Sequence, residues 1–72
     1  MVQIIVNVEQ GEYSYGAFCD ELPGCVAVAT SRPEIEQKMK RAIAEHLEHT
    51  KKKGEEVPDL FDGPYDLRFV YH

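Results

Sequence analysis

The sequence has no tryptophan and no long run of apolar residues, and it is short, with 72 residues. No segment approaches the ~18 consecutive apolar residues that identify a membrane-spanning helix. The N-terminus lacks the basic start and the apolar stretch of a signal peptide. We therefore expect a single domain over residues 1–72 that is cytoplasmic and makes no contact with a membrane.

Cysteine is also scarce, because only Cys19 and Cys25 are present. They flank a Pro-Gly pair, so a disulfide between them is conceivable, but thiols stay reduced in the cytoplasm. Two cysteines without a nearby Cys or His pair do not supply the four ligands of a structural zinc site. We expect both to be buried thiols, since free cysteine packs as a small hydrophobe.

Basic residues are fewer than acidic ones, with 8 Lys and Arg against 13 Asp and Glu and a net charge of −5. Phosphate contacts need clustered Lys and Arg, so the composition argues against direct binding of nucleic acid. The aromatic residues are therefore interpreted as core and protein-interface residues rather than as a platform for RNA bases. An acidic surface favours a basic protein partner, and plain solubility is the alternative explanation.

One helix is predicted over Ser31 to Lys53. Its apolar stripe recurs at helical spacing and consists of Ile35, Met39, Ala42, Ile43, His46, Leu47 and Thr50. Ser31 and Glu34 form a capping-box pattern, and Pro33 fits the first turn. Gly54 is expected just after the helix in the left-handed conformation.

Four strands are predicted around this helix. Their ranges are Val2–Val8, Glu12–Cys19, Cys25–Thr30 and Tyr65–Tyr71. Gly11 is expected to allow a tight turn after the first strand, and Pro23-Gly24 fits a type II turn after the second. The region 55–64 reads as a loop, because it holds two prolines and a glycine.

The predicted fold is α+β with element order β-β-β-α-β. Short turns make the first three strands antiparallel, and a right-handed crossover places the fourth beside the first in a four-stranded mixed sheet, order 3-2-1-4. The helix covers one face. The outer strands are open edges, which predicts a homodimer or a larger homo-oligomer.

The sequence does not predict a metal site or a catalytic centre. His46 and His49 are one helical turn apart, near Glu45 and Glu48, but structural metal sites need four ligands and a packed or interface role is the preferred interpretation. Two-metal nuclease chemistry needs converging carboxylates. Glu9, Asp66 and the helix glutamates are candidates, but the first strand has no Asp in its middle, so we expect no catalytic residue, metal or cofactor.

An ordered set of motifs between Tyr13 and Pro58 resembles the HicB-like antitoxin domain. The aromatic second strand is followed by an acidic turn with Pro-Gly-Cys, a strand of small residues, a helix with an Ala-Ile and Leu-Glu core, a glycine and a Val-Pro pair. The matching residues are Tyr15, Asp20, Leu22-Pro23-Gly24-Cys25, Ala29, Thr30, Glu34, Ala42-Ile43, His46-Leu47-Glu48, Gly54 and Val57-Pro58.

The resemblance implies a partial ribonuclease H-like fold and a non-enzymatic role as an antitoxin. Such domains cover the active surface of a small basic toxin (HicA-like), with a double-stranded-RNA-binding-like fold, that cleaves messenger RNA. Many also carry a C-terminal DNA-binding segment. This sequence ends at His72, soon after the last predicted strand, so we expect no such segment here.

The predicted contact surface centres on the acidic Pro-Gly turn. Its residues are Glu12, Tyr15, Asp20, Glu21, Pro23, Gly24 and Cys25. Two alternatives stay open: a solitary oligomeric scaffold or ligand-binding protein without a toxin, and a degenerate ribonuclease H-like nuclease.

Overall fold

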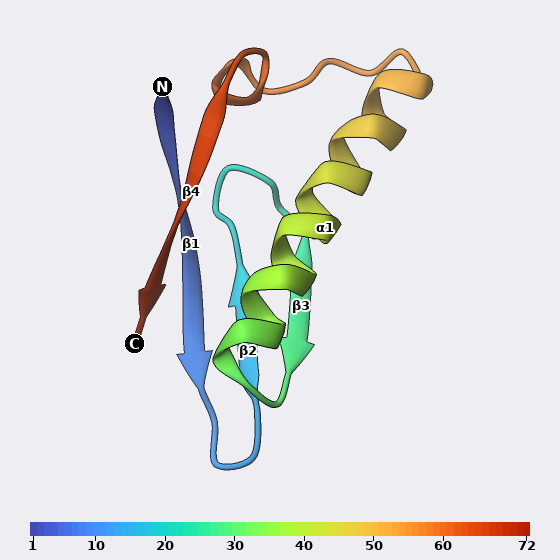
Figure 1. Cartoon of the computed structure of the whole chain (residues 1–72). Helices are drawn as coiled ribbons and strands as arrows, with labels where there is room; N and C mark the ends of the chain where they lie inside the picture. The colour runs from blue at the N-terminus through green and yellow to red at the C-terminus, as the bar shows by residue number, and fades with distance from the viewer.

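The computed structural model describes residues 1–72, except for the side chain of Leu60. The chain runs through β1 (Val2–Gln10), β2 (Tyr15–Phe18), β3 (Val26–Ala29), α1 (Arg32–Lys52), a 3-10 turn η1 (Asp59–Phe61) and β4 (Tyr65–Tyr71). The strands form one mixed sheet in the order β3-β2-β1-β4, with β4 parallel to β1, and α1 lies across one side (Figure 1). The predicted α+β fold and strand order are confirmed.

Buried and less buried residues alternate along β1, and this alternation gives the sheet an inner face. Ile4, Val6 and Val8 are buried under the helix layer, while between them Ile5 is exposed and Asn7 is half-buried. β2 and β3 offer small residues on the same face, where Ala17 and Ala29 are buried and Ala27 is half-buried. Small side chains allow α1 to lie close to these two strands.

The first hairpin differs from its prediction. β1 continues to Gln10, which pairs with Tyr15, so β2 begins three residues later than expected. The turn is closed by the Gly11 amide, which donates to the Ser14 carbonyl at 2.7 Å. Gly11 does not adopt a positive φ angle; among the described residues only Gly24 and Gly54 do. The longer connection removes the need for a left-handed residue.

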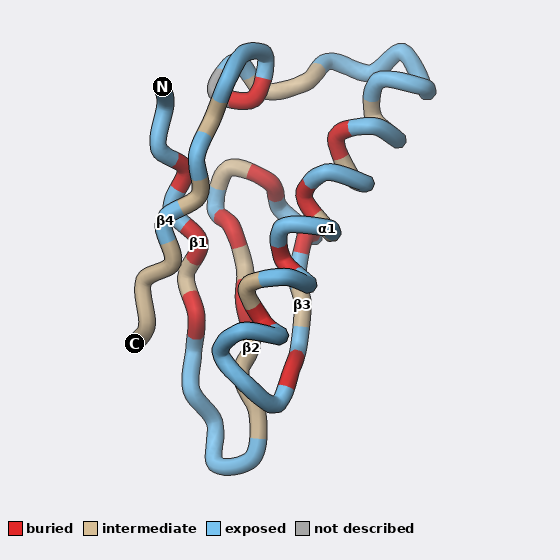
Figure 2. The backbone as a smooth tube through the Cα atoms, in the orientation of Figure 1, coloured by how far each residue is buried: buried red, intermediate tan, exposed pale blue. Residues whose placement is uncertain are grey.

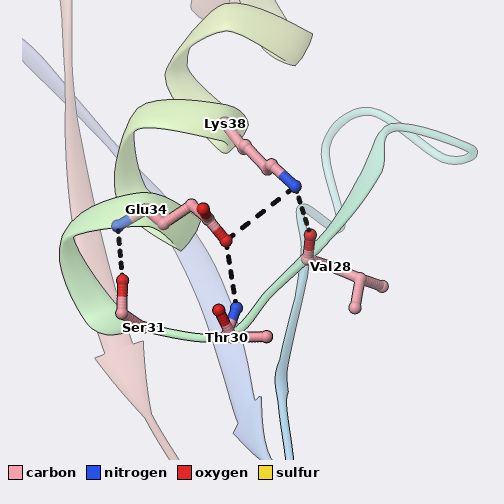
Figure 3. A network of polar contacts seen from close by, with 5 residues as sticks. All are labelled: Val28, Thr30, Ser31, Glu34 and Lys38. Atoms are coloured by element: carbon pink, nitrogen blue, oxygen red, sulfur yellow. Dashed lines mark hydrogen bonds and ion pairs between the residues drawn. The ribbon is translucent and has the colours of Figure 1, made fainter.

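The helix has the predicted buried stripe, with Ile35, Met39, Ile43 and Leu47 as its buried members. Ser31 caps the first turn by accepting a hydrogen bond from the Glu34 amide at 3.3 Å. The return bond of the predicted capping box is shifted by one residue. The Glu34 carboxylate accepts from the Thr30 amide at 3.1 Å rather than from that of Ser31 (Figure 3).

The C-terminus of α1 ends as the sequence predicts. Gly54 has a φ of 74°, and its amide donates to the Lys51 carbonyl at 3.1 Å. The Glu55 amide donates to the Thr50 carbonyl at 3.1 Å. This pair of bonds is a Schellman motif, which satisfies two carbonyls that the helix would otherwise leave without donors.

The helix is not centred on the sheet. It packs mainly on β3 and β2 and diverges from β1 and β4 toward its C-terminus (Figure 1). The inner side chains of β4 are therefore only half-buried, as Figure 2 shows along that strand; they are Tyr65, Leu67, Phe69 and Tyr71. The predicted loop 55–64 contains η1, which brings Phe61 into the core with 3% of its surface exposed.

None of the described helices packs on the opposite face of the sheet (Figure 1). Sheet register places Phe18 beside Val26, and both lie on the face away from α1. Val26 and Val28 are each 63% exposed, and Ile5 is 47% exposed. None of the described helices has the length and apolar character needed to cross a membrane.

Candidate partner-binding surface

The connection between β2 and β3 consists of two consecutive turns. The Leu22 amide donates to the Cys19 carbonyl, and the Cys25 amide donates to the Leu22 carbonyl, each at 3.1 Å. Gly24 has a φ of 89° in the second turn. This is the type II geometry that Pro23-Gly24 predicts, because a residue with a Cβ is strained at that angle.

Buried side chains anchor these turns from below. Cys19, Leu22 and Cys25 are each at most 5% exposed and belong to the core. Asp20, Pro23 and Gly24 are exposed between them, and Glu21 is half-buried. Buried anchors therefore alternate with more exposed positions along the turn. The two acidic residues Asp20 and Glu21, called the acidic tip below, are held by these anchors.

Both cysteines are free and buried, as expected. Burial is the main cause that raises the pKa of the Cys19 thiol above its ordinary value. The thiol also donates a hydrogen bond to the Glu21 carboxylate at 3.4 Å, which acts in the same direction. Burial likewise raises the pKa of Cys25. Both thiols therefore stay protonated at neutral pH and are poor nucleophiles.

A groove runs between this turn and the middle of α1. It has a volume of about 480 Å³ and is lined by Gly24, Cys25, Val26, Ala42, Glu45, His46 and His49. The two histidines considered as metal ligands thus lie beside the acidic turn. No group of three or more His, Cys, Asp or Glu side chains within the described part of the chain is arranged to hold a metal ion.

Within the described part of the chain, no basic side chain forms an ion pair with Asp20 or Glu21. The ion pairs found among the described residues join Glu34 to Lys38 and Glu48 to Lys52 along α1. Asp20 and Glu21 are in neither pair. A basic partner that approached the turn would therefore not have to break an existing ion pair.

The seven residues predicted to bind a partner do not form one surface. Asp20, Glu21, Pro23 and Gly24 lie together at one end of β2, and Glu12 lies beyond its other end, in the β1–β2 turn (Figure 1).

Two of the seven are not available as exposed contacts. Tyr15 is half-buried on the helix side, where its ring meets that of Tyr71 edge-on at 6.3 Å. Cys25 is 5% exposed and serves as an anchor of the turn rather than as a contact residue. The prediction grouped these residues because they are close in sequence, whereas β2 separates them in space.

A second polar cluster was not predicted. Tyr71 at the end of β4 donates its phenol hydrogen bond to the Glu36 carboxylate, and the Arg32 guanidinium lies 4.4 Å from the Tyr71 ring centroid. Burial, followed by the hydrogen bond and negative charge of Glu36, raises the pKa of Tyr71 to about 12. No sequence signal indicates this contact, since only the register of β4 brings the two segments together.

The carboxylates considered for a nuclease site fall on two sides of the sheet. Glu9 and Asp66 alternate with inward residues and lie on the uncovered face, opposite Gly16 and Gln3 respectively. The glutamates of α1 belong to the other layer. The sheet therefore lies between the two groups.

Comparison with known proteins gave no match: no family model, no curated protein and no solved structure is similar to this chain. The resemblance to HicB-like domains therefore stays a prediction, based on the ordered motifs.

Proposed function

We propose that the chain is a HicB-like antitoxin-type binding module that neutralises a small basic mRNA-cleaving toxin by protein–protein contact, without enzymatic activity. The observation that carries the proposal is the acidic turn Asp20–Gly24, which is exposed, held by buried anchors and placed beside a groove. We place the toxin's basic surface on this turn and on the adjoining part of α1.

Preorganisation of the turn supports this role. Binding is weakened by the cost of ordering loops at an interface, and a turn that is already fixed avoids most of that cost. The net charge of −5 attracts a basic protein at long range, and Asp20 and Glu21 supply local complementarity. The histidines of the groove offer hydrogen-bond donors and acceptors next to the acidic tip.

The strand order gives further support. The β-β-β-α-β arrangement with β4 parallel to β1 is the architecture that the family resemblance implies. This support is an analogy at the level of the fold, since one fold serves many functions. The charge and geometry of the turn carry the more specific part of the proposal.

A solitary scaffold is the second candidate function. The observation in its favour is the uncovered sheet face, where large apolar side chains are exposed without a toxin being needed to explain them. The two candidates differ in their gene neighbourhood. The antitoxin role requires a small basic reading frame next to this gene, and the scaffold role does not.

The test of the antitoxin role uses the product of that adjacent reading frame. We expect its production alone to cleave messenger RNA and arrest growth, and we expect co-production of this chain to relieve both effects. Asp20→Lys combined with Glu21→Lys should weaken binding by roughly tenfold or more, because like charges then face each other.

Glu12→Lys together with Glu9→Lys is the matched control, since it changes the net charge equally at the far end of β2. This control variant should retain most of the protection against the toxin. Any small loss reflects the weaker long-range attraction of a less negative chain. A missing reading frame would contradict the antitoxin role, and an equal loss of binding in both double variants would contradict the proposed surface.

A further inference from the structure

The two edges of the sheet are built differently. β3 is short, and a side chain from α1 covers its edge: the Lys38 ammonium donates to the Val28 carbonyl at 3.1 Å (Figure 3). Lys38 also lies 4.0 Å from the Glu34 carboxylate, which accepts from the Thr30 amide. A charged side chain at a sheet edge, lysine above all, is a common protection against pairing with another chain, and here Lys38 reaches the edge from α1.

Among the described residues, no lysine and no side chain from α1 donates to the β4 edge in this way. β4 spans seven residues, pairs only with β1 and forms the outer strand of the sheet (Figure 1). The His72 amide donates inward to the Val8 carbonyl at 2.8 Å. Since backbone groups alternate along a strand, the N–H and C=O groups of Leu67 and Phe69 point outward. The outward Leu67 amide meets only the carboxylate of its neighbour Asp66, at 3.1 Å.

The β4 sequence is complementary to itself in one antiparallel register. When Leu67 faces Leu67 of a second copy, Asp66 faces Arg68 of that copy, and Tyr65 faces Phe69. Opposite charges and aromatic pairs that face each other directly stabilise a sheet. Shifting the centre to Arg68 would instead bring two arginines together. The charges therefore select the register centred on Leu67.

The placement of these side chains suits that register. Asp66 and Arg68 are exposed on the face away from α1, so they can meet across the new boundary. Tyr65 and Phe69 are half-buried on the helix side, because α1 diverges from β4. A second copy would cover their remaining exposed surface with its own aromatic rings.

We propose that two copies of the chain associate by antiparallel pairing of their β4 strands about Leu67. Two four-stranded sheets then join into one of eight strands, with both helices on the same side. The Asp66 carboxylate leaves the Leu67 amide, which donates to the second copy, and pairs with Arg68 there. The β4 edge lies across the sheet from β3 and the acidic turn, so this dimer does not depend on the proposed function.

The test uses two charge-reversal variants whose mixture should pair again. Sedimentation of the full chain measures how much dimer each sample contains. The natural chain should be a dimer. Asp66→Arg and Arg68→Asp each place like charges opposite one another twice, and each should raise the dissociation constant at least tenfold. An equimolar mixture of the two variants restores opposite charges at both positions and should form a heterodimer. Thermal unfolding of each variant verifies that the fold is intact.

Four outcomes would overturn the proposal. The first is a natural chain that stays monomeric up to about 1 mM, because its affinity for a second copy is then negligible. Single reversals that leave the dimer unchanged, or a mixture that stays monomeric while both variants are folded, also exclude this register. A dimer lost with Val28→Asp but kept with both charge reversals would place the interface on the uncovered face instead. None of these results bears on the acidic turn.

Discussion

At the scale of single residues, Tyr71 connects β4 to the first turns of α1. Its phenol is bound to the Glu36 carboxylate, its ring lies under the Arg32 guanidinium and its edge-on neighbour is Tyr15. Three elements, β2, β4 and α1, therefore meet at one side chain. Burial of the phenol raises its pKa most, and the hydrogen bond and negative charge of Glu36 raise the pKa further.

We predict that Tyr71 ionises at about pH 12 and that its two charged neighbours shift its pKa in opposite directions. Glu36→Gln should lower the pKa of Tyr71, because a negative charge is removed, and Arg32→Gln should raise it. Tyrosinate absorbance during alkaline titration measures both shifts, and Tyr71→Phe identifies the transition. An unchanged transition in Glu36→Gln would contradict the hydrogen bond.

The same shift has a consequence for stability at high pH. The folded pKa of Tyr71 lies above the value of about 10 expected for the unfolded chain. The folded state therefore holds the proton more strongly, and the stabilisation is fully present below pH 10 and lost as pH rises toward 12. Tyr71→Phe should remove this part of the alkaline loss of stability.

At the scale of elements, the connection between β2 and β3 depends on one backbone angle. Gly24 has a φ of 89°, and a Cβ built there meets no atom within 4 Å. Gly24→Ala should therefore lower the free energy of unfolding by about 1–2 kcal/mol through backbone strain alone. Gly16→Ala is the matched control, because Gly16 is in extended β2 with equally open space.

Urea denaturation of both variants measures this difference. The control should be neutral or slightly stabilising, since glycine weakens a strand. Equal stability of the two variants would mean that the turn does not need its left-handed residue.

Several elements were predictable because local patterns agreed with the final packing. The stripe from Ile35 to Leu47 is long enough to define one helix, and Ser31 and Gly54 mark its ends. The alternation of β1 and β4 defined their inner faces, and short turns with one long connection gave the strand order. These features depend on residues close to one another in sequence.

The remaining features depend on contacts between distant segments. Phe61 lies in a short stretch without periodicity that begins and ends with an aspartate, Asp59 and Asp62, yet the docking of η1 buries it. The lateral position of α1 decides that Tyr65 and Phe69 are only half-buried, and no local pattern encodes that position. The candidate surface was overextended to Glu12 because its distance from Asp20 depends on the length and direction of β2.

At the scale of the whole molecule, the fold separates two surfaces. The acidic turn and the groove lie beside β3, and the open β4 edge lies at the other side of the sheet (Figure 1). A dimer formed through β4 would leave both acidic turns free. If both proposals hold, two basic partners would bind one dimer without competing for the same strands.

Residue-by-residue NMR tests the proposed docking surface most directly. The isotopically labelled chain is titrated with the proposed toxin, the product of the small basic reading frame that the antitoxin role requires next to this gene. The account predicts the largest shift changes in residues 20–26 and 42–49, with the turn at residues 11–14 unchanged. Changes centred on residues 11–14 or on the uncovered face, or no changes at all, would contradict it.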